Sequence, residues 1–127
     1  MNPSGKTILI VDDDKDFCYL MQVMFKKNDF HLLLAYNAEE AIGLIKNTHP
    51  PEVIDLVLLD IQMPRVSGYT VLEVLKELRP EIPVVAITAY GMTGEREKCL
   101  NMGFDAYISK PFEEQELHST ISQLLNH

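Results

Sequence analysis

The sequence has 127 residues, of which 46% are hydrophobic and 24% are charged, a composition typical of one soluble globular domain. The formal net charge of −8 argues against a protein that binds nucleic acid or anionic membranes, because both tasks need a basic surface. No apolar run approaches the ~18 residues of a membrane span and no signal-peptide pattern is present, so we expect a cytoplasmic protein. Cys18 and Cys99 stand in no metal-binding or redox spacing, and we expect reduced packing residues.

Strands and amphipathic helices are predicted to alternate along the chain. Residues 1–6 are expected to form a flexible lead, and residues 7–127 a single domain. Apolar runs predict strands at 7–11, 30–35, 54–59, 83–87 and 105–109.

The helices between the strands are predicted from apolar residues three and four positions apart. Their inner faces carry Phe17, Leu20, Met21, Met24 and Phe25; Ala38, Ala41, Ile42 and Ile45; Val71, Val74, Leu75 and Leu78; and Leu117, Ile121, Leu124 and Leu125. A weakly amphipathic fourth helix is expected to end at Gly103. Asp14 is a predicted N-cap, and Asn37 with Glu40 forms a predicted capping box.

This alternation predicts an α/β fold, a parallel sheet covered on both faces and joined by right-handed crossovers. Polar residues stand where four of the strands end: Asp12 and Asp13, then Asp60, Thr88 and Lys110. Because the carboxyl ends of parallel strands lie at one edge, these side chains are expected to form one site.

Three carboxylates within ~4 Å of one another repel by a few kcal/mol per pair, so a cation is expected between them. Carboxylate oxygens without nearby Cys or His favour Mg²⁺ or Mn²⁺ over zinc. With a metal ion and Lys110 neutralising charge, Asp60 could attack a phosphoryl group and form an aspartyl-phosphate. The hydroxyl of Thr88 could then bond the phosphoryl oxygens.

Four motifs stand in a fixed order along the chain. They are Ile-Leu-Ile-Val-Asp-Asp-Asp at 8–14, Asp60 followed by Met63-Pro64 and Gly68, Ile87-Thr88-Ala89, and Tyr107-Ile-Ser-Lys110-Pro111. Together they resemble the receiver domain of two-component response regulators, over nearly the whole chain. The resemblance implies a flavodoxin-like sheet of order 2-1-3-4-5 with five helices, and a cis peptide bond between Lys110 and Pro111.

The resemblance also implies a phosphorylation-dependent switch. Asp60 would accept a phosphoryl group from a histidine kinase or a histidine phosphotransfer protein. Mg²⁺ would be held by Asp13, Asp60 and the backbone carbonyl of Gln62, with Asp12 orienting a water of the ion. Lys110 would contact the phosphoryl group. Such a domain promotes its own phosphorylation and dephosphorylation but turns over no separate substrate.

In the same resemblance, Thr88 and Tyr107 are switch residues, with Tyr107 turning inward as Thr88 moves toward the phosphate. The surface formed by the fourth helix, fifth strand and fifth helix would then change. Gln62 and Tyr90 match positions that set the lifetime of the phosphate. Residues 95–107 are similar to receivers attached to hybrid histidine kinases, with a stand-alone regulator as the alternative. Phosphorylation-dependent homodimerisation is a separate expectation that the resemblance leaves open.

Two other classes of function compete with this reading. A phosphohydrolase of the haloacid dehalogenase type also forms an aspartyl-phosphate, but it needs an acid two residues after the nucleophile, where this chain has Gln62. A flavodoxin-like binding module needs a phosphate-cradling loop after the first strand, where this chain has acids. A degenerate receiver that serves only as a docking surface is disfavoured because no key residue is missing. No DNA-binding or catalytic output segment is recognised, so the output is expected to pass through another domain or protein.

Overall fold

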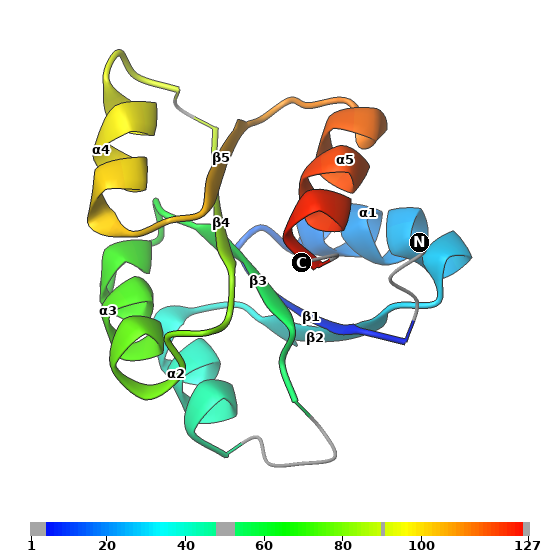
Figure 1. Cartoon of the computed structure of the whole chain (residues 1–127), viewed down its shortest axis with the longest axis horizontal. Coiled ribbons are helices and arrows are strands. Elements are labelled where there is room, and N and C mark those ends of the chain that lie inside the picture. Colours follow the sequence, from blue (N-terminus) through cyan, green and yellow to red (C-terminus); the bar gives the residue numbers. More distant parts are fainter. Residues whose placement is uncertain (1–4, 48–52, 90, 126–127) are drawn as a thin grey trace.

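A parallel sheet of five strands forms the centre of the computed structural model, which describes residues 5–47, 53–89 and 91–125 (Figure 1). The strands are β1 (Thr7–Val11), β2 (His31–Ala35), β3 (Leu56–Asp60), β4 (Val84–Thr88) and β5 (Ala106–Ser109). Their order is β2-β1-β3-β4-β5, and every neighbouring pair is parallel. The predicted flavodoxin-like order is therefore confirmed.

Helices cover both faces of the sheet (Figure 1). They are α1 (Lys15–Phe25), continued by the short 3₁₀ turn η1 (Lys26–Asn28), α2 (Ala38–Asn47), α3 (Gly68–Leu78), α4 (Glu95–Met102) and α5 (Glu114–Leu125). Helices α1 and α5 lie on one face, and α2, α3 and α4 lie on the other. The peptide bond between Lys110 and Pro111, after β5, is cis as expected.

The apolar strands supply both halves of the hydrophobic core, because their side chains alternate between the two faces of the sheet. In β1, Leu9 and Val11 pack into the cluster under α2, α3 and α4, whereas Ile8 and Ile10 pack into the cluster under α1 and α5. Cys99 belongs to the first cluster and Cys18 to the second, and both thiols are free and buried. They are packing residues, as predicted.

The predicted helix ends are supported by the expected capping contacts. The carboxylate of Asp14 accepts hydrogen bonds from the backbone N–H groups of Asp16 and Phe17 at 3.0 and 3.2 Å. Asn37 caps α2 by accepting from the Glu40 N–H at 2.8 Å. Gly103 ends α4 with a φ of 115°, a conformation that other residues rarely adopt.

Two predicted core positions are wrong. Leu20 is 51% exposed, because the buried side of α1 is centred on Cys18, Met21 and Phe25, about 130° around the helix from it. Leu78 is 41% exposed because it is the last residue of α3, and Leu72 is buried instead.

The strand boundaries also differ slightly from the prediction. Strand β3 runs on to include Asp60, so this residue is the last of the strand and not the first of the loop. Residues 1–4 of the predicted lead and the loop at 48–51 lie outside the described residues, whereas Gly5 donates a 2.9 Å backbone hydrogen bond to Asp29. Among the helices of the described ranges, none is long and apolar enough to cross a membrane.

Candidate functional site

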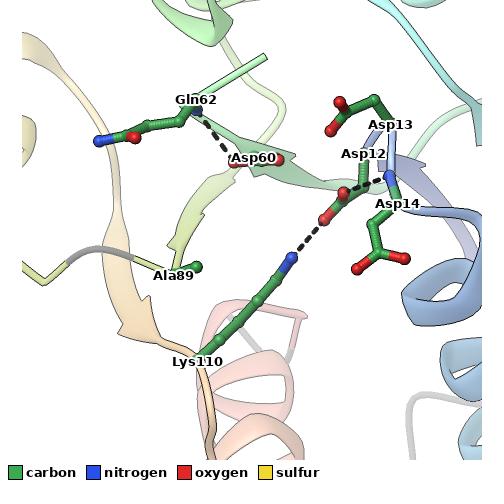
Figure 2. A pocket seen from close by; sticks show the side chains of 7 residues that line it. All are labelled: Asp12, Asp13, Asp14, Asp60, Gln62, Ala89 and Lys110. Atoms are coloured by element: carbon green, nitrogen blue, oxygen red, sulfur yellow. Dashed lines mark hydrogen bonds and ion pairs between the residues drawn. The ribbon is translucent and has the colours of Figure 1, made fainter.

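A pocket opens where β1 and β3 end, at the point where the chain order of the sheet reverses. Its volume is about 240 Å³. The residues that line it are Asp12, Asp13, Asp14, Asp60, Gln62, Ala89 and Lys110 (Figure 2). These residues come from four separate stretches of sequence, which the parallel topology brings to one edge of the sheet.

Three carboxylates gather in this pocket. Asp12 is 1% exposed and Asp60 is 7% exposed, whereas Asp13 is exposed at the rim. One oxygen from each of the three lies within 4.8 Å of the others. The clustering predicted from the strand ends is thus present in the fold.

Backbone N–H groups hold two of these carboxylates in place. The Oδ1 atom of Asp12 accepts a 2.9 Å hydrogen bond from the N–H of Asp14, and the Oδ1 atom of Asp60 accepts one of 2.9 Å from the N–H of Gln62. Figure 2 shows the Gln62 side chain extending away from the acidic cluster, so this residue meets the cluster through its backbone. Orientation by the backbone leaves the second oxygen of Asp60 available to a ligand, whereas the second oxygen of Asp12 contacts Lys110.

Lys110 brings a positive charge to the cluster from the end of β5. Its Nζ atom lies 2.8 Å from Oδ2 of Asp12, and its side chain is 18% exposed. The same ammonium group stands 3.9 Å from the ring centroid of Phe17 in α1, an additional cation–π contact. The backbone N–H of Lys110 donates to the carbonyl of Thr88 at 2.7 Å, which ties the lysine to the neighbouring strand.

The electrostatics of the pocket are dominated by Asp60. The pKa of its carboxyl group is raised to about 7, mainly by burial and to a lesser extent by the nearby charges of Asp12 and Asp13. The Gln62 N–H and Lys110 act in the opposite direction without cancelling this effect. Because one lysine faces three carboxylates, the charged form of Asp60 favours an additional cation.

The donor set of this cluster suits a small divalent ion. The group consists only of carboxylates, with no His or Cys in it. Hard oxygen donors of this kind favour Mg²⁺ or Mn²⁺, which take one or two carboxylates and complete their coordination with water or phosphate. The residues present therefore fit the metal that the sequence predicts.

Gly68 lets α3 begin close beneath the pocket. A Cβ at this position would lie 2.5 Å from the carbonyl oxygen of Asp60 and 2.7 Å from Cα of Ile61. Both atoms belong to the backbone and have little freedom to move away. The glycine of the Asp60 motif thus serves the close packing of α3 against the end of β3.

The switch and tuning residues take different positions relative to the pocket. Thr88 is fully buried at the end of β4, next to Ala89 in the pocket wall. Tyr107 is 8% exposed and belongs to the core cluster on the α4 side of the sheet. Tyr90 lies outside the described residues.

Sequence reasoning did not single out Glu95 or Phe17 as part of this region. Phe17 was assigned only to the core, whereas its ring contacts the ammonium group of Lys110. Glu95 is a buried carboxylate at the start of α4 and bonds Tyr107. Its spacing of four residues from the buried Cys99 is a signal that could have placed it on the inner face of that helix.

The chain resembles one protein family over almost its whole length. The family model described as "Response regulator receiver domain" matches residues 8–122. The transcriptional regulatory protein CpxR of Klebsiella pneumoniae is 36% identical over 120 residues, which cover 93% of this chain and 48% of that protein. The chain spans about half the length of the curated relatives that it matches.

Solved structures agree with the family match. A CheY-like receiver domain of Methanospirillum hungatei is 32% identical with a TM-score of 0.85, covering 95% of this chain and 94% of that one. The response regulator TrrA of Thermotoga maritima, solved in complex with Mg²⁺ and BeF, is 28% identical with a TM-score of 0.81, covering 94% and 98%. The chain therefore belongs to the response regulator receiver domains, the phosphorylation-dependent signalling modules of two-component systems.

Proposed function

We propose that Asp60 is the residue of this receiver that accepts the phosphoryl group. The observation that carries this assignment is its position: a carboxylate at the end of β3, beside two further acids and within one pocket with Lys110. Asp12 is bonded to Lys110, and Asp13 stands exposed at the rim. Asp60 is the member of the cluster held by the Gln62 N–H with its second oxygen free for attack.

The reaction moves a phosphoryl group from a phosphohistidine of a partner protein to Asp60. A carboxylate oxygen of Asp60 attacks the phosphorus, the P–N bond to the imidazole breaks, and the imidazole nitrogen keeps the electron pair of that bond. The product is an acyl phosphate, which water later hydrolyses to inorganic phosphate and the free carboxylate. The domain thus takes part in its own phosphorylation and dephosphorylation without turning over a separate substrate.

Asp13, Asp60 and the backbone carbonyl of Gln62 would hold Mg²⁺, with Asp12 beside them. The ion supplies charge neutralisation for the phosphoryl oxygens during transfer. Lys110 supplies a second positive charge, and it can leave Asp12 for a phosphoryl oxygen because its ammonium group is a point donor on a flexible stem. The Thr88 hydroxyl provides a further donor at the adjoining strand end.

Phosphorylation would alter the surface formed by α4, β5 and α5. The added group carries up to about two negative charges, which favours whichever arrangement of Thr88, Lys110 and Tyr107 compensates them best. A histidine kinase or a histidine phosphotransfer protein is the proposed donor. Because the chain spans about half of its relatives, the proposed output lies in another domain or protein, as the name of the transcriptional regulatory protein CpxR suggests for that relative.

The test is the intact mass of the protein after incubation with Mg²⁺ and acetyl phosphate. We expect the wild type to gain one phosphoryl group, which hydroxylamine then removes because it cleaves acyl phosphates. Asp60→Asn should gain none. Asp16→Asn, which removes an exposed carboxylate outside the pocket, should gain the phosphoryl group as the wild type does.

A folded wild type that gains no mass, beside a receiver that does, would overturn the proposal in favour of a docking module. Phosphorylation of Asp60→Asn to the same extent as the wild type would assign the acceptor role to another residue. Repeating the reaction with EDTA tests the metal, since the gain of mass should then be lost.

A further inference from the structure

A third buried carboxylate lies outside the acidic pocket, at the first residue of α4. Glu95 is 8% exposed, and its Oε1 atom accepts a 2.6 Å hydrogen bond from the hydroxyl of Tyr107. Tyr107 is itself 8% exposed. Carboxylates are rarely buried unless their charge is compensated, so this pair needs an explanation beyond simple packing.

The position of Glu95 in α4 accounts for part of the compensation. A negative charge at the first turn of a helix is favoured by the helix dipole and by the unpaired N–H groups there. The preceding residue, Gly94, makes no side-chain cap. The Tyr107 hydroxyl adds a charge-assisted hydrogen bond, the stronger class of such bonds.

Helix α4 has few other attachments to the interior. Glu95 and Cys99 are its only buried residues, and its other side chains are exposed, including the apolar Leu100 and Met102. The bond from Tyr107 is therefore a principal polar link between the first turn of α4 and β5. Burial raises the pKa of Tyr107, and the bond to Glu95 raises it further, so this hydroxyl keeps the proton that it donates.

The same tyrosine hydroxyl lies close to the chain that leaves the phosphorylation pocket. A Cβ at Gly91 would stand 2.7 Å from Oγ of Ser109 and 3.7 Å from the hydroxyl oxygen of Tyr107. Ser109 pairs in register with Thr88, and Lys110 follows it directly. Tyr107 is thus placed between the first turn of α4 and the ends of β4 and β5, where Thr88 and Lys110 are the proposed phosphate contacts.

We propose that Glu95 is a positioning residue of the switch, which holds Tyr107 inward before any phosphoryl group is present. Without the carboxylate, the tyrosine hydroxyl would lose this acceptor in the interior and would regain a partner by rotating into water. The position of the first turn of α4 and the inward or outward position of Tyr107 are then linked through one hydrogen bond. Phosphorylation acts on a domain whose tyrosine is already inward, and loss of Glu95 makes the inward state harder to reach.

The first test measures the position of Tyr107 without phosphorylation. The protein is labelled with 3-fluorotyrosine, the Tyr107 resonance is assigned with Tyr107→Phe, and its solvent exposure is read from the ¹⁹F shift between H₂O and D₂O. Glu95→Leu introduces an apolar side chain that favours a helix and removes the acceptor. We expect the ratio of inward to outward Tyr107 to fall by about tenfold or more, as for loss of a hydrogen bond to a charged group.

Two variants separate positioning from a general effect on the helix. Glu95→Gln keeps an oxygen acceptor at the same place and should keep Tyr107 mostly inward, which makes it a rescue by the conservative residue. Glu97→Leu makes the same exchange as Glu95→Leu at an exposed position of the same turn and should leave the Tyr107 signal unchanged. An inward Tyr107 in Glu95→Leu, or equal exposure in Glu97→Leu, overturns the proposal.

The second test uses the rate of phosphorylation by acetyl phosphate in a double-mutant cycle. This part rests on the proposed function, whereas the ¹⁹F measurement does not, so failure of either can be recognised separately. We expect Glu95→Leu to slow phosphorylation several-fold when it is the only substitution. It should cause no further slowing when it is added to Tyr107→Phe. If the rate of the double variant falls by the product of the two single-variant factors, Glu95 acts through another contact. If Glu95→Leu folds poorly, Glu95→Ala takes its place in the cycle, because it also removes the acceptor while Tyr107→Phe breaks the same pair from the other side.

Discussion

Replacing Asp60 by Asn should stabilise the domain in the absence of divalent ions. Asp60 is 7% exposed, and oxygens of Asp12 and Asp13 lie within 4.8 Å of its own. The charge therefore loses hydration on folding and also meets two like charges, with Lys110 already bonded to Asp12. The amide keeps an oxygen that can accept the Gln62 N–H, but it carries no charge.

The expected size of the gain can be worked out from the repulsion between the carboxylates and from the raised pKa of Asp60, which includes that repulsion. At an effective dielectric constant of about 20, two charges 4.8 Å apart repel by about 3.5 kcal/mol. Raising the pKa of Asp60 from 3.8 to about 7 corresponds to about 4 kcal/mol at pH values above 7. We therefore expect the variant to exceed the wild type by up to about 4 kcal/mol in the free energy of unfolding at pH 8.

The pH dependence has a definite sign. Between about pH 4 and 7 the folded protein keeps a proton on Asp60 that the unfolded chain has lost, so the stability of the wild type decreases as the pH rises through this window. Asn has no such proton. The advantage of Asp60→Asn should thus grow by about 2 to 3 kcal/mol between pH 5 and pH 8.

Urea unfolding followed by far-UV circular dichroism in EDTA measures this difference at pH 5, 6, 7 and 8. Asp16→Asn provides the control, because it removes an exposed carboxylate and should show no growing advantage over this range. Added Mg²⁺ should stabilise the wild type in proportion to its binding and Asp60→Asn much less. Equal stability of wild type and Asp60→Asn at pH 8, or a difference that does not change with pH, would refute the electrostatic reasoning.

Three further predictions concern the backbone, a cap and a thiol. Gly68→Ala should lower the free energy of unfolding by about 1 to 3 kcal/mol, because its Cβ meets the Asp60 carbonyl. Gly43→Ala, which has open space around it, should raise the free energy of unfolding by about 0.5 to 1 kcal/mol. Similar effects of the two substitutions in urea unfolding would contradict this. Asp14→Ala should cost about 1 kcal/mol in the same assay through loss of the α1 cap, and no loss would argue against that cap. Cys18, whose pKa is raised to about 11 by burial and neighbouring acids, should stay unreactive toward a disulfide reagent at pH 8 until urea unfolds the protein, and rapid labelling of the native fold would contradict its burial.

The helix caps and most of the strand assignments followed from the sequence because they depend on local chemistry. Asp14, Asn37 and Gly103 act within a few residues of themselves, through a side-chain acceptor or a backbone conformation. Apolar runs that are buried on both faces of a parallel sheet are equally visible in one dimension. The convergence of Asp12, Asp60 and other strand-end residues could be predicted because parallel strands place their carboxyl ends at one edge.

Other features depended on contacts between segments far apart in the sequence, which no local pattern specifies. Leu20 is exposed because α1 packs against the sheet with a different side. Leu78 is exposed because α3 ends at this residue. The pairing of Lys110 with Asp12 joins residues that are 98 positions apart. The bond between Glu95 and Tyr107 is of the same kind, because a glutamate at the start of a helix looks like an ordinary solvated residue until the packing of α4 against β5 buries it. Local propensity and periodicity determined the elements and the edge where the site lies, and tertiary packing decided which charges are buried and which partners compensate them.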